Sequence, residues 1–244
     1  MSGAAADPLP AGGGAVWRYV VQRPSPAAVE LLATLSRLAA EERARLLRGE
    51  PHQARTIVGA AAEAGLPAAQ VLLGRMLLDG AGGERDEVCA CGWFQRAAAG
   101  GDVEAWNMVG RCFENGWGVS IGYAQAAACY RHAARAGDSW AQYNLGHLYL
   151  DGQGVRRDPV RAFQWYWESA RQGHARAMNL VGRCYEQGWG VSRDRERAAS
   201  WYRASAERGY FRGQYNHASL LMVLGRQAEA LVWLRRAAAQ APPG

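Results

Sequence analysis

The sequence predicts an all-α fold, a solenoid in which two-helix units are stacked one upon the next. Three observations lead to this class. The chain repeats itself at an interval of 36 residues, apolar residues within each interval have helical spacing, and glycines mark the boundaries. The interval is set most clearly by Gly65, Gly101, Gly137, Gly173 and Gly209. One such unit cannot bury its apolar face alone, so several must stack to form a continuous core.

The first helix of a unit is predicted from the stretch 102–115, "DVEAWNMVGRCFEN". Its apolar face comprises Ala105, Val109, Cys112 and Phe113. Asp102 stands where an N-cap is needed, because its carboxylate can accept hydrogen bonds from free N–H groups of the first turn. Gly116 is expected to end the helix, since glycine adopts the left-handed conformation at the lowest cost.

The second helix of the same unit is predicted to run from about residue 123 to 136, with Ala126, Tyr130 and Ala134 on one face. Glycine also recurs inside each first helix, at 110 and 182 among other positions. There it costs roughly 0.5–1 kcal/mol relative to alanine. The expected compensation is a close approach of the partner helix.

The chain is expected to divide into four parts. We predict an extended or disordered segment over 1–24, an N-terminal helical cap or degenerate repeat over 25–65, four full repeats over 66–208, and a shortened repeat over 209–244. The segment "WRYVVQ" (17–22) falls outside the period. It could form a strand, dock on the first helices, occupy a groove or pair with a second copy.

Composition and motifs together limit the classes of function that the sequence can have. The 244 residues carry a formal charge of +6, and all 28 basic residues are arginine, which a codon bias would also explain.

The sequence has no recognisable signal peptide and no apolar run of membrane-spanning length. It contains five cysteines, and we therefore expect reduced thiols in the cytoplasm. No Ser/His/Asp or Cys/His arrangement is readable, and Cys89 and Cys91 diverge on a helix. We expect no enzyme, catalytic residue, cofactor, metal site or membrane association.

The repeats resemble a known family. The unit pattern A-x-x-x-L-G-x-x-Y-x-x-G-x-G-V, followed by A-x-x-W-Y-x-x-A-A, is similar to the Sel-one-like repeat, a relative of the tetratricopeptide repeat. Residues 141–173 match it nearly throughout, and the resemblance covers about 54–240. It implies a right-handed α/α superhelix whose first helices line a concave face. It also implies an adaptor or scaffold that binds other proteins and carries no catalysis.

The face of each first helix opposite the core is the candidate binding groove for a peptide or a helix of a partner. Asparagine can bridge both polar groups of a peptide backbone, arginine can clamp a carboxylate, and aromatic rings add contact area. The candidate groove residues are Asn107, Arg111, Trp140, Tyr143, His147, Asn179, Arg183 and Tyr215. The partner's identity and the oligomeric state stay open.

One eleven-residue phrase occurs twice, as "GRCFENGWGVS" at 110–120 and "GRCYEQGWGVS" at 182–192. The likeness is either functional or a relic of duplication. Its tryptophans, Trp117 and Trp189, either pack onto the next unit or form an exposed aromatic edge. The alternative function is RNA binding through a stripe of groove arginines: Arg75, Arg111, Arg176, Arg183 and Arg212. Interleaved glutamates weaken that alternative.

Overall fold

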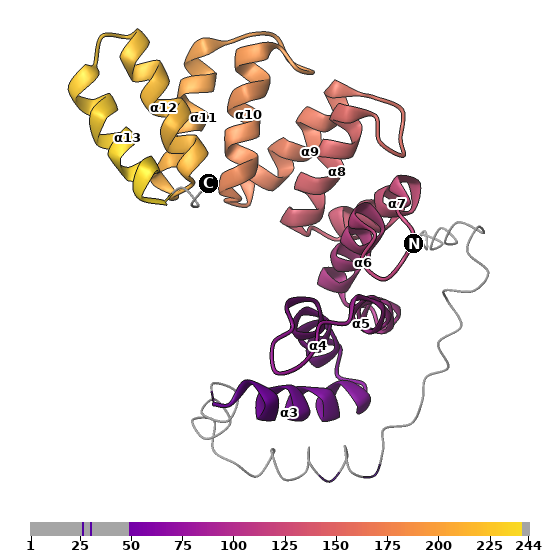
Figure 1. The fold of residues 1–244 in the computed structure, drawn as a ribbon. Coiled ribbons are helices and arrows are strands. Elements are labelled where there is room, and N and C mark those ends of the chain that lie inside the picture. The colour runs from indigo at the N-terminus through magenta and orange to yellow at the C-terminus, as the bar shows by residue number, and fades with distance from the viewer. Residues whose placement is uncertain (1–25, 27–29, 31–48, 241–244) are drawn as a thin grey trace, which may run out of the picture. The chain divides into compact units, whose positions relative to one another are not determined.

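The computed structural model describes residues 49–240 together with residues 26 and 30. Within this described part the chain forms eleven helices and no strand (Figure 1). The predicted fold class, an all-α solenoid of helix pairs, is confirmed. The segment 17–22, whose conformation the sequence leaves open, and most of the part of the predicted N-terminal cap that precedes residue 49 lie outside the described residues.

The helices have nearly equal lengths and alternate between first and second positions in each repeat. They are α3 (Pro51–Glu63), α4 (Pro67–Asp79), α5 (Glu87–Ala99), α6 (Val103–Asn115), α7 (Tyr123–Arg135), α8 (Ser139–Asp151), α9 (Pro159–Arg171), α10 (Ala175–Gln187), α11 (Arg195–Glu207), α12 (Phe211–Val223) and α13 (Gln227–Gln240).

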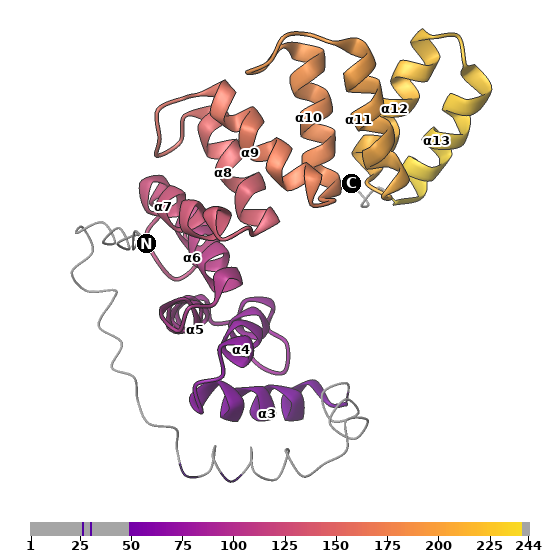
Figure 2. The same cartoon turned by 180° about the vertical axis from the view of Figure 1, so that it is seen from behind.

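The chain divides into two compact units between Ala133 and Ala134. In the first unit α3 packs on α4, α4 on α5 and α5 on α6. In the second unit each helix from α8 to α13 packs on the next one, as both views show (Figures 1 and 2). There α10 also contacts α12, so first helices of successive repeats adjoin.

The helix boundaries follow from capping residues in the repeat. The Asp102 carboxylate accepts a hydrogen bond from the backbone N–H of Ala105 at 2.8 Å, as expected of the N-cap of α6. Gly116 ends α6 with φ at 75°, in the left-handed region where a side chain is strained. Both features confirm the predicted limits of this helix.

Glycines inside the first helices let an aromatic ring of the second helix touch the backbone. A Cβ added to Gly110 would lie 2.5 Å from Cε1 of Tyr130, and one added to Gly182 would lie 2.6 Å from Cδ1 of Tyr202. Both rings are fully buried, with Tyr130 0% and Tyr202 1% exposed. The predicted close approach of paired helices is therefore confirmed.

The thiols are mostly inside this core. Cys89 is exposed, whereas the other four cysteines are buried and all five are free. Burial raises the pKa of the Cys184 thiol to about 12. Across the part of the chain that is described, no group of three or more His, Cys, Asp or Glu side chains could hold a metal ion. Nor does any helix there have the length and apolarity needed to cross a membrane.

Candidate functional site

The second unit contains a cavity of about 900 Å³. Three first helices, α8, α10 and α12, contribute most of its wall, and the last helix, α13, contributes the rest. The lining residues are Tyr143, His147, Arg176, Asn179, Leu180, Arg183, Tyr210, Phe211, Arg212, Tyr215, Asn216, Leu234, Ala237 and Ala238. We call this cavity the groove of the second unit.

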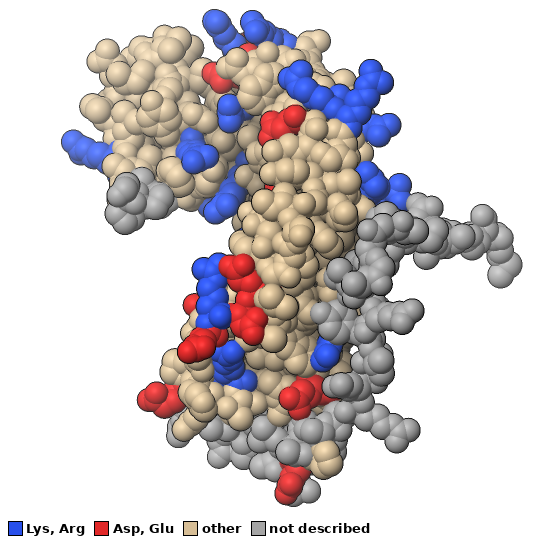
Figure 3. All heavy atoms as spheres, turned by 45° about the vertical axis from the view of Figure 1, so that its right-hand side comes forward, with Lys and Arg blue, Asp and Glu red and all other residues tan. Residues whose placement is uncertain are grey.

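The groove is cationic and contains no acidic side chain. Its three charged residues are Arg176, Arg183 and Arg212. Residues 134–244 hold 16 of the 28 arginines but only 9 of the 22 acidic residues, so the positive charge of the protein belongs to this unit. On the face shown in Figure 3, blue basic side chains predominate over red acidic ones across this unit.

Each groove arginine lies over an aromatic ring instead of pairing with a carboxylate. The guanidinium of Arg176 lies 5.3 Å from the ring centroid of Trp140, and that of Arg183 lies 4.9 Å from the centroid of Trp189. The guanidinium of Arg212 lies 5.6 Å from the centroid of Phe211. A ring face attracts the cation through its quadrupole. Stacking thus orients these guanidinium groups without neutralising them.

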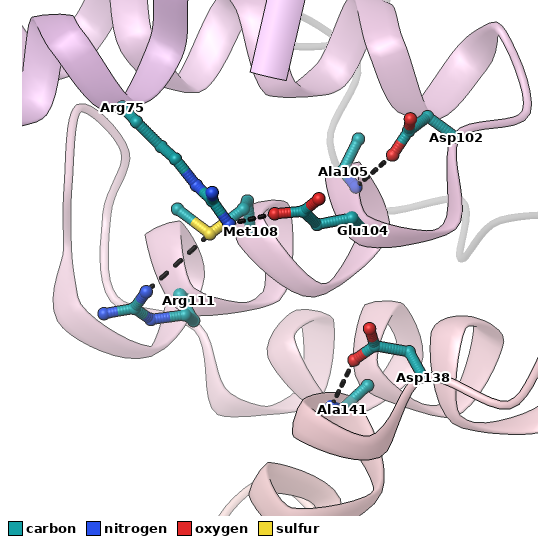
Figure 4. Close-up of polar contacts among 8 residues, drawn as sticks. All are labelled: Arg75, Asp102, Glu104, Ala105, Met108, Arg111, Asp138 and Ala141. Carbon is teal, nitrogen blue, oxygen red and sulfur yellow. Dashed lines mark hydrogen bonds and ion pairs between the residues drawn. The ribbon is translucent and has the colours of Figure 1, made fainter. Parts of the chain in front are cut away.

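Of the two stripe arginines in the first unit, Arg75 differs from the groove arginines because it has a carboxylate partner. Arg75 forms an ion pair with Glu104 across α4 and α6 (Figure 4). Arg111 donates a hydrogen bond to the sulfur of Met108 at 3.7 Å, also drawn in Figure 4. The charge of Arg75 is therefore balanced locally, whereas the groove arginines of the second unit have no ion-pair partner among the described residues.

A cluster of rings lies beside the arginines. Tyr143 packs against His147 with ring centroids 4.6 Å apart, and Trp140 packs against His174 at 4.4 Å. His174 caps α10, because its Nδ1 accepts the backbone N–H of Ala177 at 3.3 Å. Burial, with Arg176 adding to it, lowers the pKa of His174 to about 4, and burial also lowers the pKa of His147. The histidines are therefore neutral at pH 7, and the groove's charge comes from arginine.

The eleven-residue phrase takes part in two contacts, one within it and one with a tyrosine of the following helix, and both occur in each copy. In the first copy Arg111 lies 4.8 Å over the ring centroid of Trp117, which matches the arrangement of Arg183 over Trp189. In addition, the hydroxyl of Tyr130 donates to the carboxylate of Glu114 at 2.5 Å. The equivalent hydroxyl in the second copy, on Tyr202, donates to Glu186 at 2.8 Å. The tryptophans are partly buried beneath their arginines.

The third repeat lacks the phrase, and its contacts change accordingly. Leu150 occupies the position of the two glutamates, and the buried hydroxyl of Tyr166 has no hydrogen-bond partner among the described residues. His147 takes the position of the phrase arginine, and Gln153 takes that of the tryptophan. The recurring likeness of the second and fourth repeats thus corresponds to a recurring set of side-chain contacts.

The predicted groove residues fall into three groups. Five of them line the groove of the second unit: Tyr143, His147, Asn179, Arg183 and Tyr215. Trp140 lies on α8 beside the groove, where it is 45% exposed and stacks with Arg176. Asn107 and Arg111 belong to α6 in the first unit.

Both asparagines differ from the expectation that they face away from the core. Asn107 is 6% and Asn179 is 4% exposed. The side-chain oxygen of Asn179 accepts a hydrogen bond from the amide nitrogen of Asn216 at 2.8 Å. The helix face is rotated enough that this position lies at the floor of the groove. Asn179 therefore forms part of the floor of the groove, where its side-chain amide is hydrogen-bonded to that of Asn216.

Several residues that line the groove were not predicted from the sequence. Leu180, Phe211 and Asn216 adjoin the predicted stripe, which took only widely spaced positions of each first helix. Leu234, Ala237 and Ala238 lie on α13, a second helix, whereas all the predicted groove residues belong to first helices. The shortened loop before α13 was the one visible signal that the last repeat differs.

The repeats match a family model described as "Sel1 repeat" over residues 67–102, 103–138, 141–174, 175–210 and 213–242. No curated protein matches the chain. Among solved structures, a Sel1 repeat protein from Oxalobacter formigenes is 32% identical with a TM-score of 0.78, covering 89% of this chain and 91% of its own. The antigen c5321, described as a protective antigen of uropathogenic Escherichia coli strains with an SLR fold, is 29% identical with a TM-score of 0.71. This match covers 86% of the present chain, which spans about half (48%) of the antigen. The chain therefore belongs to the Sel1 repeat family.

Proposed function

We propose that this protein is a non-catalytic interaction module that binds a peptide segment of a partner protein in the groove of its second unit. Sel1 repeat proteins are generally protein-interaction modules, which supports the class of function. The observation that carries the proposal is the groove itself, a cavity of about 900 Å³ framed by rings and guanidinium groups.

The composition of the groove suits protein recognition. Arginine and tyrosine are among the residues that dominate binding energy at protein interfaces, because they combine large contact areas with directional donors. Tyr215 is 57% exposed although it is a large aromatic residue on the wall of a cavity. A peptide that covered this ring would remove its apolar surface from water, at roughly 25 cal/mol per Å².

The experiment is a selection of peptides from a displayed library on the full chain, followed by fluorescence anisotropy with labelled versions of the selected peptides. Tyr215→Ala should weaken their binding by about tenfold or more, which is roughly 1.4 kcal/mol. The matched control is Val160→Ala, which removes an exposed apolar side chain from α9 in the same unit, outside the groove. The control should bind like the unmodified chain.

Two results would refute the proposal. One is that the library yields no peptide that binds the full chain. The other is that the selected peptides bind Tyr215→Ala and Val160→Ala equally well, because the groove would then not be their site. Circular dichroism of both variants checks that each retains its helices.

A further inference from the structure

We infer that the peptide segment bound in the groove is acidic, with carboxylates placed among Arg176, Arg183 and Arg212. This inference rests on the proposed function and adds the chemistry of the partner to it. Its basis is the state of the three arginines, the charge around them and the apolar surface beside them.

The arginines are oriented but have unused donors. A guanidinium carries five N–H donors along its edges, and stacking on a ring occupies only its face. Arg176 and Arg183 stack on Trp140 and Trp189, yet neither donates a hydrogen bond to any described residue. A carboxylate accepts two parallel N–H bonds from such a group, and these are stronger than bonds between neutral partners.

The surroundings favour negative charge in the groove. No aspartate or glutamate lines it, and residues 134–244 carry 16 arginines against 9 acidic residues. An excess of one sign in a concave site attracts ligands of the opposite sign and repels those of the same sign. The two histidines near the site, His147 and His174, have lowered pKa values and add no charge at neutral pH.

The apolar wall selects a peptide over a nucleic acid. Tyr143, Leu180, Phe211 and Leu234 give the groove a large apolar surface beside the arginines. A peptide segment that alternates acidic with apolar residues can place its carboxylates against the arginines and its apolar side chains against this surface. A nucleic acid presents a phosphate at every step and is held by a continuing track of cations. In the first unit the stripe is interrupted, because Arg75 pairs with Glu104.

The test uses the full chain and four fluorescein-labelled probes. Three are short peptides with the same phenylalanine and leucine positions, in which the intervening residues are all glutamate, all glutamine or all arginine. The fourth is an oligouridylate of similar length. Anisotropy should show the glutamate peptide binding at least about tenfold more tightly than the glutamine peptide. The arginine peptide should bind more weakly than both, and the glutamate peptide should lose affinity as NaCl increases.

Variants assign the effect to the groove. Arg176→Gln combined with Arg212→Gln should weaken binding of the glutamate peptide by about tenfold or more while leaving the glutamine peptide unchanged. Arg195→Gln is the matched control, since it removes an exposed arginine from α11 of the same unit, outside the groove. The charge reversal Arg176→Glu with Arg212→Glu should make the chain prefer the arginine peptide. Because an unfolded variant could not gain this preference, the result would also show that the reversed variant is folded.

The outcomes separate this inference from the function on which it rests. If the glutamate and glutamine peptides bind equally and Tyr215→Ala weakens both, the groove binds peptides but the acidic preference is refuted. If Tyr215→Ala and the arginine variants change no peptide's affinity, the groove is not the site and both ideas fail. If oligouridylate binds more tightly than the glutamate peptide and displaces it, the ligand is a nucleic acid and both are overturned.

Discussion

Replacing Gly182 by alanine should destabilise the second unit, although alanine is the better helix former. The added Cβ would lie 2.6 Å from Cδ1 and 2.7 Å from Cε1 of Tyr202. Carbon atoms in contact are normally about 3.5–4 Å apart, so the ring would have to retreat by about 1 Å. That ring is 1% exposed, and its hydroxyl is held by Glu186, so it has little room to move.

The expected magnitude is the difference between two effects. Overpacking a well-packed core costs typically about 1–3 kcal/mol. Replacing a helical glycine by alanine contributes about 0.5–1 kcal/mol in the opposite direction. With about 2 kcal/mol for overpacking and about 0.75 kcal/mol for helix propensity, Gly182→Ala should lower the free energy of unfolding by about 1 kcal/mol.

Gly59 provides a matched control for this substitution. It lies inside α3, and a Cβ added there would meet no heavy atom within 4 Å. Gly59→Ala should therefore raise stability by about 0.5–1 kcal/mol, the propensity effect alone. Urea denaturation followed by circular dichroism gives both midpoints. If Gly182→Ala is as stable as the unmodified chain, or moves in the same direction as Gly59→Ala, the close-packing argument is refuted.

Three further predictions concern side chains inside the repeats. Tyr202→Phe should lower stability by about 1–2 kcal/mol because it removes a hydrogen bond to a carboxylate, whereas Tyr166→Phe removes a buried hydroxyl without a partner and should be neutral or stabilising; urea melts of the pair test the difference. His174 has a folded-state pKa of about 4 against an ordinary 6.5. Between pH 4 and pH 6.5 the unfolded chain therefore binds more protons than the folded chain. Stability should accordingly fall as the pH drops from 6.5 towards about 4, and His174→Asn, a capping residue that does not titrate, should flatten this part of a stability–pH curve. With a thiol reagent at mildly alkaline pH, exposed Cys89 should react fast and buried Cys184 slowly; rapid labelling of Cys184 would contradict the assigned helix facing.

The helices and their packing could be predicted because they depend on local signals that recur. A cap such as Asp102, a terminator such as Gly116 and a small residue such as Gly182 each act within one repeat, and the 36-residue interval supplies several instances of each. Periodicity also selected Tyr143 and Arg183 as candidate groove residues, and both line the cavity of the second unit. Repetition thus turned weak local preferences into a firm prediction of the fold.

The remaining features depend on angles and distances that a periodic pattern does not specify. A modest rotation of a helix decides whether Asn179 opens to the groove or lies at its floor, where it is 4% exposed. The part of the wall formed by Leu234 depends on how the last, shortened helix pair closes on its neighbours. The position of Trp189 under Arg183 required the path of the loop between them.

The stack of Arg111 on Trp117 has a consequence for how such proteins diversify. Both partners lie within one run of eleven residues, 110–120, as do their counterparts in 182–192. A recombination event that copies this run therefore transmits the whole contact, ready to form wherever the run is inserted in register. The groove of the second unit is the opposite case, because its wall is assembled from four helices and has to be selected position by position. Duplicating one short run therefore reproduces the arginine–tryptophan contact, whereas no single run of the chain reproduces the groove.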